Sequence, residues 1–177
     1  MIETGIHYLS RYASPLGEIV MAADAGDALT GLWLPGQLHF ATTLAHEVRE
    51  EERDVHRLAA EWLDCYFAGE VPRFMPRVHL QGTPFQLKVW SVLLGIPYGM
   101  TMSYGEVARE VARMMGVERM SAQAVGGAVG RNPISIIIPC HRVVGSRGNM
   151  TGYAGGIAKK VALLQLEGVL RTACPPC

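Results

Sequence analysis

Residues 103–130 of this 177-residue chain read SYGEVAREVARMMGVERMSAQAVGGAVG and predict two short helices joined by a turn. Ser103 is suited to cap the first helix, and Glu106, three residues later, completes a capping box. Gly116 ends that helix, and Ser121 caps the second. The pattern is typical of a helix-turn-helix, although other packed helical pairs share it.

The charge distribution indicates a polyanionic partner for this half of the chain. Six basic and twelve acidic residues give residues 1–78 a net charge of −6, whereas ten basic and four acidic residues give residues 79–177 a net charge of +6. No acidic residue lies between Arg119 and Leu166. A basic segment beside an acidic one favours contact with a polyanion such as DNA. Chance clustering on two solvated faces is the alternative.

The composition excludes several classes of protein. With 49% hydrophobic and 18% charged residues, the chain can bury a core as one domain or two small ones. It is therefore not a disordered chain, a collagen-like repeat or a coiled coil. No apolar run approaches the roughly 20 residues of a membrane span, and the N-terminus lacks the pattern of a signal peptide. We expect a cytoplasmic protein without membrane contact.

The four cysteines are too few and too unevenly spread for a disulfide framework. Cys174 and Cys177 have the spacing of a metal or redox pair, but no second pair completes a zinc site. Cys65 falls in a predicted helix, where a small buried hydrophobic residue is expected. We expect no metal and no cofactor.

The N-terminal half predicts a small α+β unit. Strands are expected at residues 6–12, 18–23 and 29–34, because turn residues separate apolar-rich runs. A helix is expected over 54–68, where apolar residues recur at helical spacing, and a short edge strand over 71–75. No residue of this half points to chemistry.

The short apolar run 134–138, expected as a buried strand or extended segment, leads into Pro139-Cys140-His141. Proline fixes the backbone before the cysteine, and a thiol beside a histidine is typical of an activated nucleophile. Adjacent residues of an extended chain point to opposite sides, so His141 would act through a water or after a turn. A buried, inert cysteine is the competing interpretation.

The residues around Cys140 resemble the active-site signature of a known family. Asn132-Pro133-Ile134 and Ile138-Pro139-Cys140-His141-Arg142-Val143 match the O6-alkylguanine-DNA alkyltransferases, or methylated-DNA–protein-cysteine methyltransferases. Further motifs in the family's order are Phe85-Gln86-Leu87-Lys88-Val89-Trp90, Ser103-Tyr104-Gly105, Ala124-Val125-Gly126-Gly127, Gly152-Tyr153-Ala154-Gly155-Gly156 and Leu166-Glu167-Gly168. The resemblance covers residues 83–170 and extends more weakly to Gly31-Leu32-Trp33 and Gly36-Gln37.

The resemblance implies an α+β protein of two domains. An RNase H-like domain with a small β-sheet and a helix would cover residues 1–79. A mostly helical, winged helix-turn-helix-like domain would carry the thiol over residues 83–172, with a tail at 173–177. Residues around 79–83 read as the linker, and Pro84 suits the first position of a helix to about Leu94. The zinc-binding regulatory domain of larger family members is not expected here, and neither is their role in transcription.

By the same resemblance, Cys140 would take the alkyl group from guanine O6 in one displacement and keep it, so that the protein is consumed. His141 would be a water-mediated base, with Glu167 orienting the imidazole and favouring its cationic form. Asn132 would brace the turns around the site, or simply serve as a turn residue. Tyr104 would assist the leaving guanine near N3.

The resemblance also implies a base-binding pocket. Its residues would be Val143, Ser135, Thr151, Tyr153 and Ala154. The backbone N–H of Ala154 would serve O6, the carbonyls of Cys140 and Val143 would accept from the exocyclic amine, and Tyr153 would form a wall. We expect O6-methylguanine to be repaired. Bulkier alkyl groups and O4-methylthymine remain open, since Ser135 replaces a proline of some relatives.

The implied partner is double-stranded DNA that contains O6-alkylguanine, bound by a monomer in the minor groove without sequence preference. The target base would be flipped out of the helix. The expected DNA-contacting residues are Gln123, Ala124, Gly126, Gly127, Ala128, Arg131, Arg142 and Arg119. Gln123 departs from the family, whose arginine there fills the vacated space. We hypothesise slower base extrusion, eased by Arg119 or Arg131.

Two other functions are compatible with parts of the sequence. A non-catalytic relative would bind alkylated DNA without chemistry, but such relatives replace the acceptor cysteine, and Cys140 is present. A cysteine hydrolase would use Cys140 and His141, but no oxyanion turn is predicted and the basic helix-turn-helix would have no purpose. Alkylation of the thiol separates the three functions.

Overall fold

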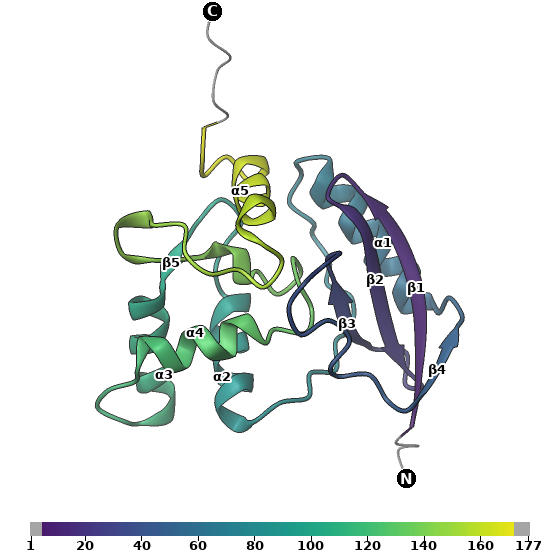
Figure 1. The fold of residues 1–177 in the computed structure, drawn as a ribbon, viewed down its shortest axis with the longest axis horizontal. Coiled ribbons are helices and arrows are strands. Elements are labelled where there is room, and N and C mark those ends of the chain that lie inside the picture. The colour runs from purple at the N-terminus through teal and green to yellow at the C-terminus, as the bar shows by residue number, and fades with distance from the viewer. Residues whose placement is uncertain (1–4, 172–177) are drawn as a thin grey trace, which may run out of the picture.

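A four-stranded sheet and one helix form the N-terminal part of the chain (Figure 1), in a computed structural model that describes residues 5–171. The strands β1 (Ile6–Ser14), β2 (Gly17–Asp24) and β3 (Leu29–Trp33) are antiparallel neighbours. The strand β4 (Glu47–Glu50) pairs in parallel with β1, so that the order is β3-β2-β1-β4. The three predicted strands are confirmed.

The prediction of an edge strand at 71–75 is wrong. The edge of the sheet next to β1 is formed by β4, which the sequence analysis missed. Residues 71–75 form no strand, and Val71 and Met75 are exposed. Pro72 lies within this segment and Pro76 follows it, and both lack the backbone donor that a ladder needs.

The helix α1 (Asp54–Phe67) covers one face of the sheet and confirms the prediction for 54–68. Apart from His56, its buried side chains are aliphatic and aromatic, and Trp62, Leu63 and Tyr66 join the main core. Gly69 follows the helix with a φ of +81°, a conformation that glycine adopts without strain.

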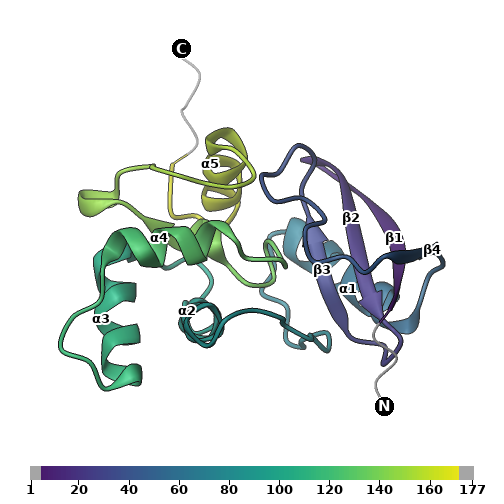
Figure 2. The same ribbon diagram turned by 60° about the horizontal axis from the view of Figure 1, so that its bottom comes forward.

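Three helices form the C-terminal part: α2 (Pro84–Leu94), α3 (Tyr104–Met115) and α4 (Ala122–Gly130). The caps predicted for α3 and α4 are confirmed. The hydroxyl of Ser103 accepts from the Glu106 backbone N–H at 3.2 Å, and the Ser103 N–H donates to the Glu106 carboxylate at 2.6 Å. Ser121 accepts from Ala124 N–H, and α4 packs against both α2 and α3 (Figure 2).

Short elements follow α4 and carry the site. The 3₁₀ turn η1 (Cys140–Arg142) leads into β6 (Val143–Val144), which pairs in parallel with β5 (Met102–Ser103). After the turn η2 (Ser146–Gly148) comes the helix α5 (Ile157–Leu166), which the sequence analysis did not predict.

The two parts are joined by one continuous hydrophobic core and by backbone pairing at the β3 edge. Leu32 N–H donates to Pro133 C=O at 2.8 Å, and Ser135 N–H donates to Leu32 C=O at 2.9 Å. The prediction that 134–138 is buried is confirmed, but it is a series of turns. Ile136 has a φ of +70°, which no strand allows and a β-branched residue rarely adopts.

No helix among residues 5–171 is both long and apolar enough to span a bilayer.

Candidate active site

Cys140 stands at the first position of η1, on the wall of a cavity of about 430 Å³ between the N-terminal and C-terminal parts. Its side chain is almost fully buried at 4% exposure. The residues that line this cavity are Leu38, His39, Tyr104, Gly126, Val129, Gly130, Cys140, Gly152, Tyr153, Ala154, Gly156 and Ile157. A cavity of this size suits a small flat ligand such as a base.

Burial raises the pKa of the Cys140 thiol, because a thiolate is poorly solvated inside the protein. The polar side chains of Asn132 and Tyr153 and the positive charge of Lys160 counteract this rise. The thiol therefore stays protonated at neutral pH until a base removes its proton.

His141 is the base available next to the thiol, and its ring is completely buried. Its Nε2 lies 2.6 Å from Oε1 of Glu167, which accepts the ring proton. Nδ1 has no hydrogen-bond partner within residues 5–171. In a neutral imidazole whose Nε2 carries the proton, Nδ1 is the atom that can accept another.

Glu167 is an ionised carboxylate held by several donors. Arg142 donates Nε to Oε2 at 2.9 Å and Nη2 to Oε1 at 3.0 Å, and the Gly99 N–H donates to Oε2 at 3.0 Å. Burial opposes the charge, but hydrogen bonds from His141 and Arg142 lower the pKa of Glu167 to about 2. Gly99 has a φ of +77°, which suits glycine and directs its N–H to the carboxylate.

Glu167 raises the pKa of His141, which favours the cationic imidazole as expected. Burial lowers this pKa more, and Arg142 already neutralises the carboxylate, so the resting imidazole is neutral. One expectation is wrong. Arg142 was expected at the DNA. Its guanidinium instead lies inside the protein, bound to Glu167 and to Ile96 C=O, which leaves it unavailable for a phosphate.

Asn132 braces the turns before Cys140, as the resemblance implies. Its Nδ2 donates to Ile138 C=O at 2.8 Å, and its Oδ1 accepts from the Ile134 N–H at 3.0 Å. These two bonds close the turns that hold Ile136 in its unusual conformation.

Lys160 of α5 binds the segment that carries the cavity residues Gly152 and Tyr153, and it was missed by the sequence analysis. It is fully buried, and its Nζ donates to the carbonyls of Val143 at 2.5 Å and of Thr151 and Gly152 at 3.2 Å. Burial lowers the pKa of Lys160 to about 8. The Tyr104 hydroxyl donates to the same carbonyls of Thr151 and Gly152, each at 3.3 Å.

The predicted pocket residues lie in different places. Tyr153 and Ala154 line the cavity, whereas the Val143 carbonyl is bound by Lys160 and Thr151 is an exposed neighbour. Ser135 is buried outside the lining, and its hydroxyl donates to Gln37 at 2.8 Å. The serine therefore ties the site to the N-terminal part instead of facing the ligand.

The predicted DNA-contacting residues lie mostly on the outer side of α4. Gln123, Ala124 and Gly127 are exposed, and Gly126 lines the cavity. Ala128, like Arg142, was expected to contact DNA, and this expectation is wrong. This alanine is only 4% exposed, and its carbonyl accepts from the Trp90 indole N–H at 2.9 Å. Arg119 and Arg131, which flank the helix, are exposed as expected.

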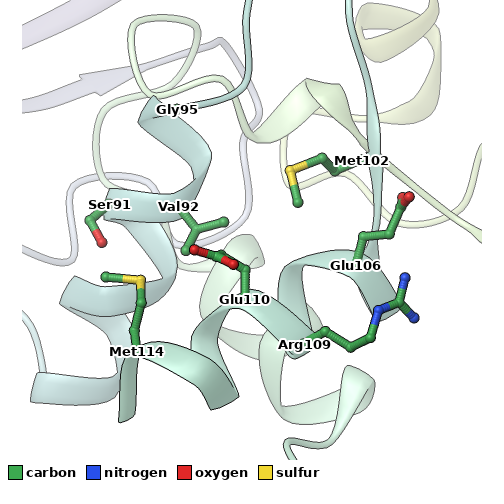
Figure 3. Close-up of a pocket in the computed structure, with 8 residues that line it drawn as sticks. All are labelled: Ser91, Val92, Gly95, Met102, Glu106, Arg109, Glu110 and Met114. Carbon is green, nitrogen blue, oxygen red and sulfur yellow. The ribbon is translucent and has the colours of Figure 1, made fainter. Parts of the chain in front are cut away.

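A larger hollow of about 540 Å³ lies between α2 and α3 (Figure 3). Met102 and Met114 line it together with Glu106, Arg109 and Glu110. Its lining contains neither cysteine nor histidine, so this hollow offers no thiol or imidazole for the reaction. Within residues 5–171 no three His, Cys, Asp or Glu side chains are grouped to hold a metal ion, and Cys174 and Cys177 lie outside the described residues.

The sequence analysis also missed three residues of the N-terminal part. Leu38 and His39 line the cavity, and the Tyr66 hydroxyl donates to Glu167 at 2.7 Å. Leu38 is fixed there because its N–H donates to Ala154 C=O at 2.9 Å. The weak motif Gly36-Gln37 was the only sequence signal for this segment.

Comparisons with known proteins agree with this arrangement. A family model described as "6-O-methylguanine DNA methyltransferase, DNA binding domain" matches residues 84–169. The methylated-DNA–protein-cysteine methyltransferase of Mycobacterium leprae is 43% identical over 154 residues, covering 87% of this chain and 88% of that protein. The protein of the same name from Mycobacterium tuberculosis H37Rv is 43% identical over 162 residues, 92% of each chain.

Solved structures show the same fold. The crystal structure of Mycobacterium tuberculosis OGT in complex with DNA has a TM-score of 0.77 and 41% identity and covers 92% of both chains. The structure of the Mycobacterium tuberculosis O6-methylguanine methyltransferase has a TM-score of 0.76. Cys140 is buried and directly precedes His141, which is hydrogen-bonded to Glu167. With these residues and with relatives alike along most of its length, this chain belongs to the methylated-DNA–protein-cysteine methyltransferase family.

Proposed function

We propose that Cys140 is the residue that accepts the alkyl group, in a reaction that each protein molecule carries out once. As a member of its family, the protein is a DNA-repair methyltransferase that acts on methylated DNA. The observation that carries the proposal is the place of Cys140, which lines the cavity and directly precedes His141, whose ring is hydrogen-bonded to Glu167.

The reaction begins when Nδ1 of His141 takes the thiol proton, through a water. The thiolate attacks the alkyl carbon of O6-alkylguanine, so that the S–C bond forms and the C–O6 bond breaks. The electron pair of that bond leaves with guanine, and the guanine anion takes a proton from the solvent. The proton taken up by His141 is released to the solvent, so that the protons balance. Cys140 ends as a thioether, which has no proton to exchange and ends the reaction.

The neutral resting histidine supports this order of steps. Because burial keeps His141 uncharged, it can accept a proton, and the Glu167 carboxylate then stabilises the imidazolium. Arg142 holds the carboxylate in place during the transfer.

Stabilisation of the leaving base falls to two other residues that line the cavity. The backbone N–H of Ala154 serves O6, and the Tyr104 hydroxyl exchanges its carbonyl partners for guanine N3. Tyr104 stays protonated, since burial raises its pKa, and so it can donate.

The base reaches the cavity by leaving the duplex, because the thiol is buried. We propose that α4 enters the minor groove with Gln123, Ala124 and Gly127, and that Arg119 and Arg131 contact phosphates. The division into an N-terminal domain at 1–79 and a DNA-binding domain at 83–172 is part of this proposal. It is supported by the family match to residues 84–169.

The test is intact-mass spectrometry after reaction with a duplex that holds one O6-methylguanine, followed by peptide mapping. We expect the mass of one methyl group per chain, located on Cys140. Cys140→Ser should gain none, whereas Cys65→Ser, which removes the other free cysteine of the described chain, should react like the wild type. DNA binding without methylation would instead mean a recognition protein, and repeated turnover a hydrolase.

A further inference from the structure

Tyr66 joins the active-site network from the N-terminal part of the chain. It belongs to α1, and its fully buried hydroxyl donates to Oε1 of Glu167 at 2.7 Å. The same hydroxyl lies 3.3 Å from Nε2 of His141. One carboxylate oxygen is thus shared by a phenol and an imidazole that lie 75 positions apart in the sequence.

The ring of Tyr66 is fixed by aromatic neighbours. It stacks on Trp62 with centroids 5.4 Å apart and meets Tyr98 edge to face at 5.9 Å. His141 lies edge to face on the same ring at 6.3 Å. Burial raises the pKa of the Tyr66 phenol, so it remains protonated and a donor at neutral pH.

The shared oxygen determines which nitrogen of His141 is basic. With Tyr66 and Arg142 also donating to it, Glu167 is a weak base that cannot remove the Nε2 proton. Nδ1 is then the ring atom left to accept a proton, and it is the one without a partner among residues 5–171. Each hydrogen bond that Glu167 accepts also reduces the extent to which its carboxylate stabilises a protonated His141.

We propose that Tyr66 is a positioning residue of the alkyl-transfer site, through which the N-terminal part holds Glu167 and sets the proton affinity of His141. This inference rests on the proposed function of Cys140 and His141. The charged and titratable groups around His141 are Glu167, Arg142, Lys160 and Tyr66, and Cys140 precedes it in the chain. The substitution Tyr66→Phe removes the phenol oxygen of one of these groups and keeps its aromatic ring.

The experiment measures the single-turnover rate of methyl transfer from duplex DNA as a function of pH. In Tyr66→Phe we expect a rate about tenfold lower at neutral pH, as for the loss of one hydrogen bond to a charged group. Without the phenol the carboxylate holds an imidazolium more strongly. The acid limb of the pH–rate profile should therefore move to higher pH.

The matched control is Tyr12→Phe. Tyr12 donates to Asp64 of the same helix at 2.6 Å, outside the site. This variant should keep the wild-type rate and pH profile, and circular dichroism should show all three proteins folded at the assay temperature. An unchanged profile in Tyr66→Phe, whether the rate falls or not, would leave Tyr66 as a packing residue and overturn the proposal.

A second measurement separates this inference from the proposed function. Cys140 is alkylated with iodoacetamide across the pH range without DNA, and peptide mapping reports that cysteine alone. If the wild type takes no methyl group from DNA, the proposed function fails. Tyr66 still sets the proton affinity of His141 if the iodoacetamide profile moves in Tyr66→Phe and not in Tyr12→Phe.

Discussion

Gln123 is exposed in the first turn of α4, just before the buried Val125 that anchors the helix. If α4 enters the minor groove, this side chain faces the gap that a flipped base leaves. A glutamine fills less of that gap than an arginine and adds no positive charge. The cost of unstacking is then less well compensated.

Gln123→Arg should raise the rate of methyl transfer on duplex DNA by about tenfold, which corresponds to about 1.4 kcal/mol in the barrier. Single-turnover kinetics with a duplex and with the same strand alone measure this effect. The single strand is the internal control, because no base pair has to open in it. Equal duplex rates for the variant and the wild type would contradict the role assigned to position 123.

Single residues of the site were predictable to different degrees. Cys140 and His141 were found because a thiol beside a histidine is rare and the surrounding motif is specific. Tyr66 and Lys160 were not. A tyrosine on the apolar side of a helix is usually a core residue, and a lysine is usually exposed. Their partners lie on segments that only the tertiary structure brings together.

At the scale of elements, turns and helix caps were predictable from the sequence. A backbone conformation that distant residues impose was not. Ser103, Ser121 and Gly116 fix the ends of α3 and α4, and each works locally. Ile136 was expected in a strand, because apolar β-branched runs favour strands. Its positive φ is imposed by Asn132 and by pairing with β3, which are distant from the local pattern.

The first turn of α1 contains a histidine that makes the stability of the protein depend on pH. His56 is fully buried, and its Nδ1 accepts from the Arg53 backbone N–H at 3.0 Å, at the start of the helix. Burial lowers the pKa of His56 below the 6.5 of an unfolded chain. Between these two pKa values the unfolded state binds more protons, so the free energy of unfolding falls as the pH falls.

His56→Gln should reduce this loss of stability. Glutamine at the same position can accept the Arg53 N–H and does not titrate, whereas protonation of His56 removes a bond worth about 1 kcal/mol. Urea unfolding between neutral pH and pH 5 measures the effect, with His46→Gln, at an exposed site, as the control. Equal pH dependence in His56→Gln and the wild type would show that His56 is not the group responsible.

At the scale of the whole molecule, the two parts share one hydrophobic core but carry opposite net charges. The core is continuous across the two parts, and the β3 edge supports the turns before Cys140. The charge is divided, with −6 over residues 1–78 and +6 over residues 79–177. The acidic part disfavours DNA contact, so the phosphate contacts should fall on the basic part alone.

Arg131→Ala should therefore weaken binding to any duplex and lower the salt dependence of that binding. Each phosphate contact releases counterions and contributes about 0.9 to the slope of log K against log salt concentration, so the slope should fall by about this amount. Fluorescence anisotropy on an unmodified duplex at several salt concentrations measures it. Arg73→Ala, which removes an exposed arginine of the acidic part, should leave the slope unchanged. The reverse pattern, with the slope reduced by Arg73→Ala only, would place the DNA on the sheet side and contradict the docking of α4.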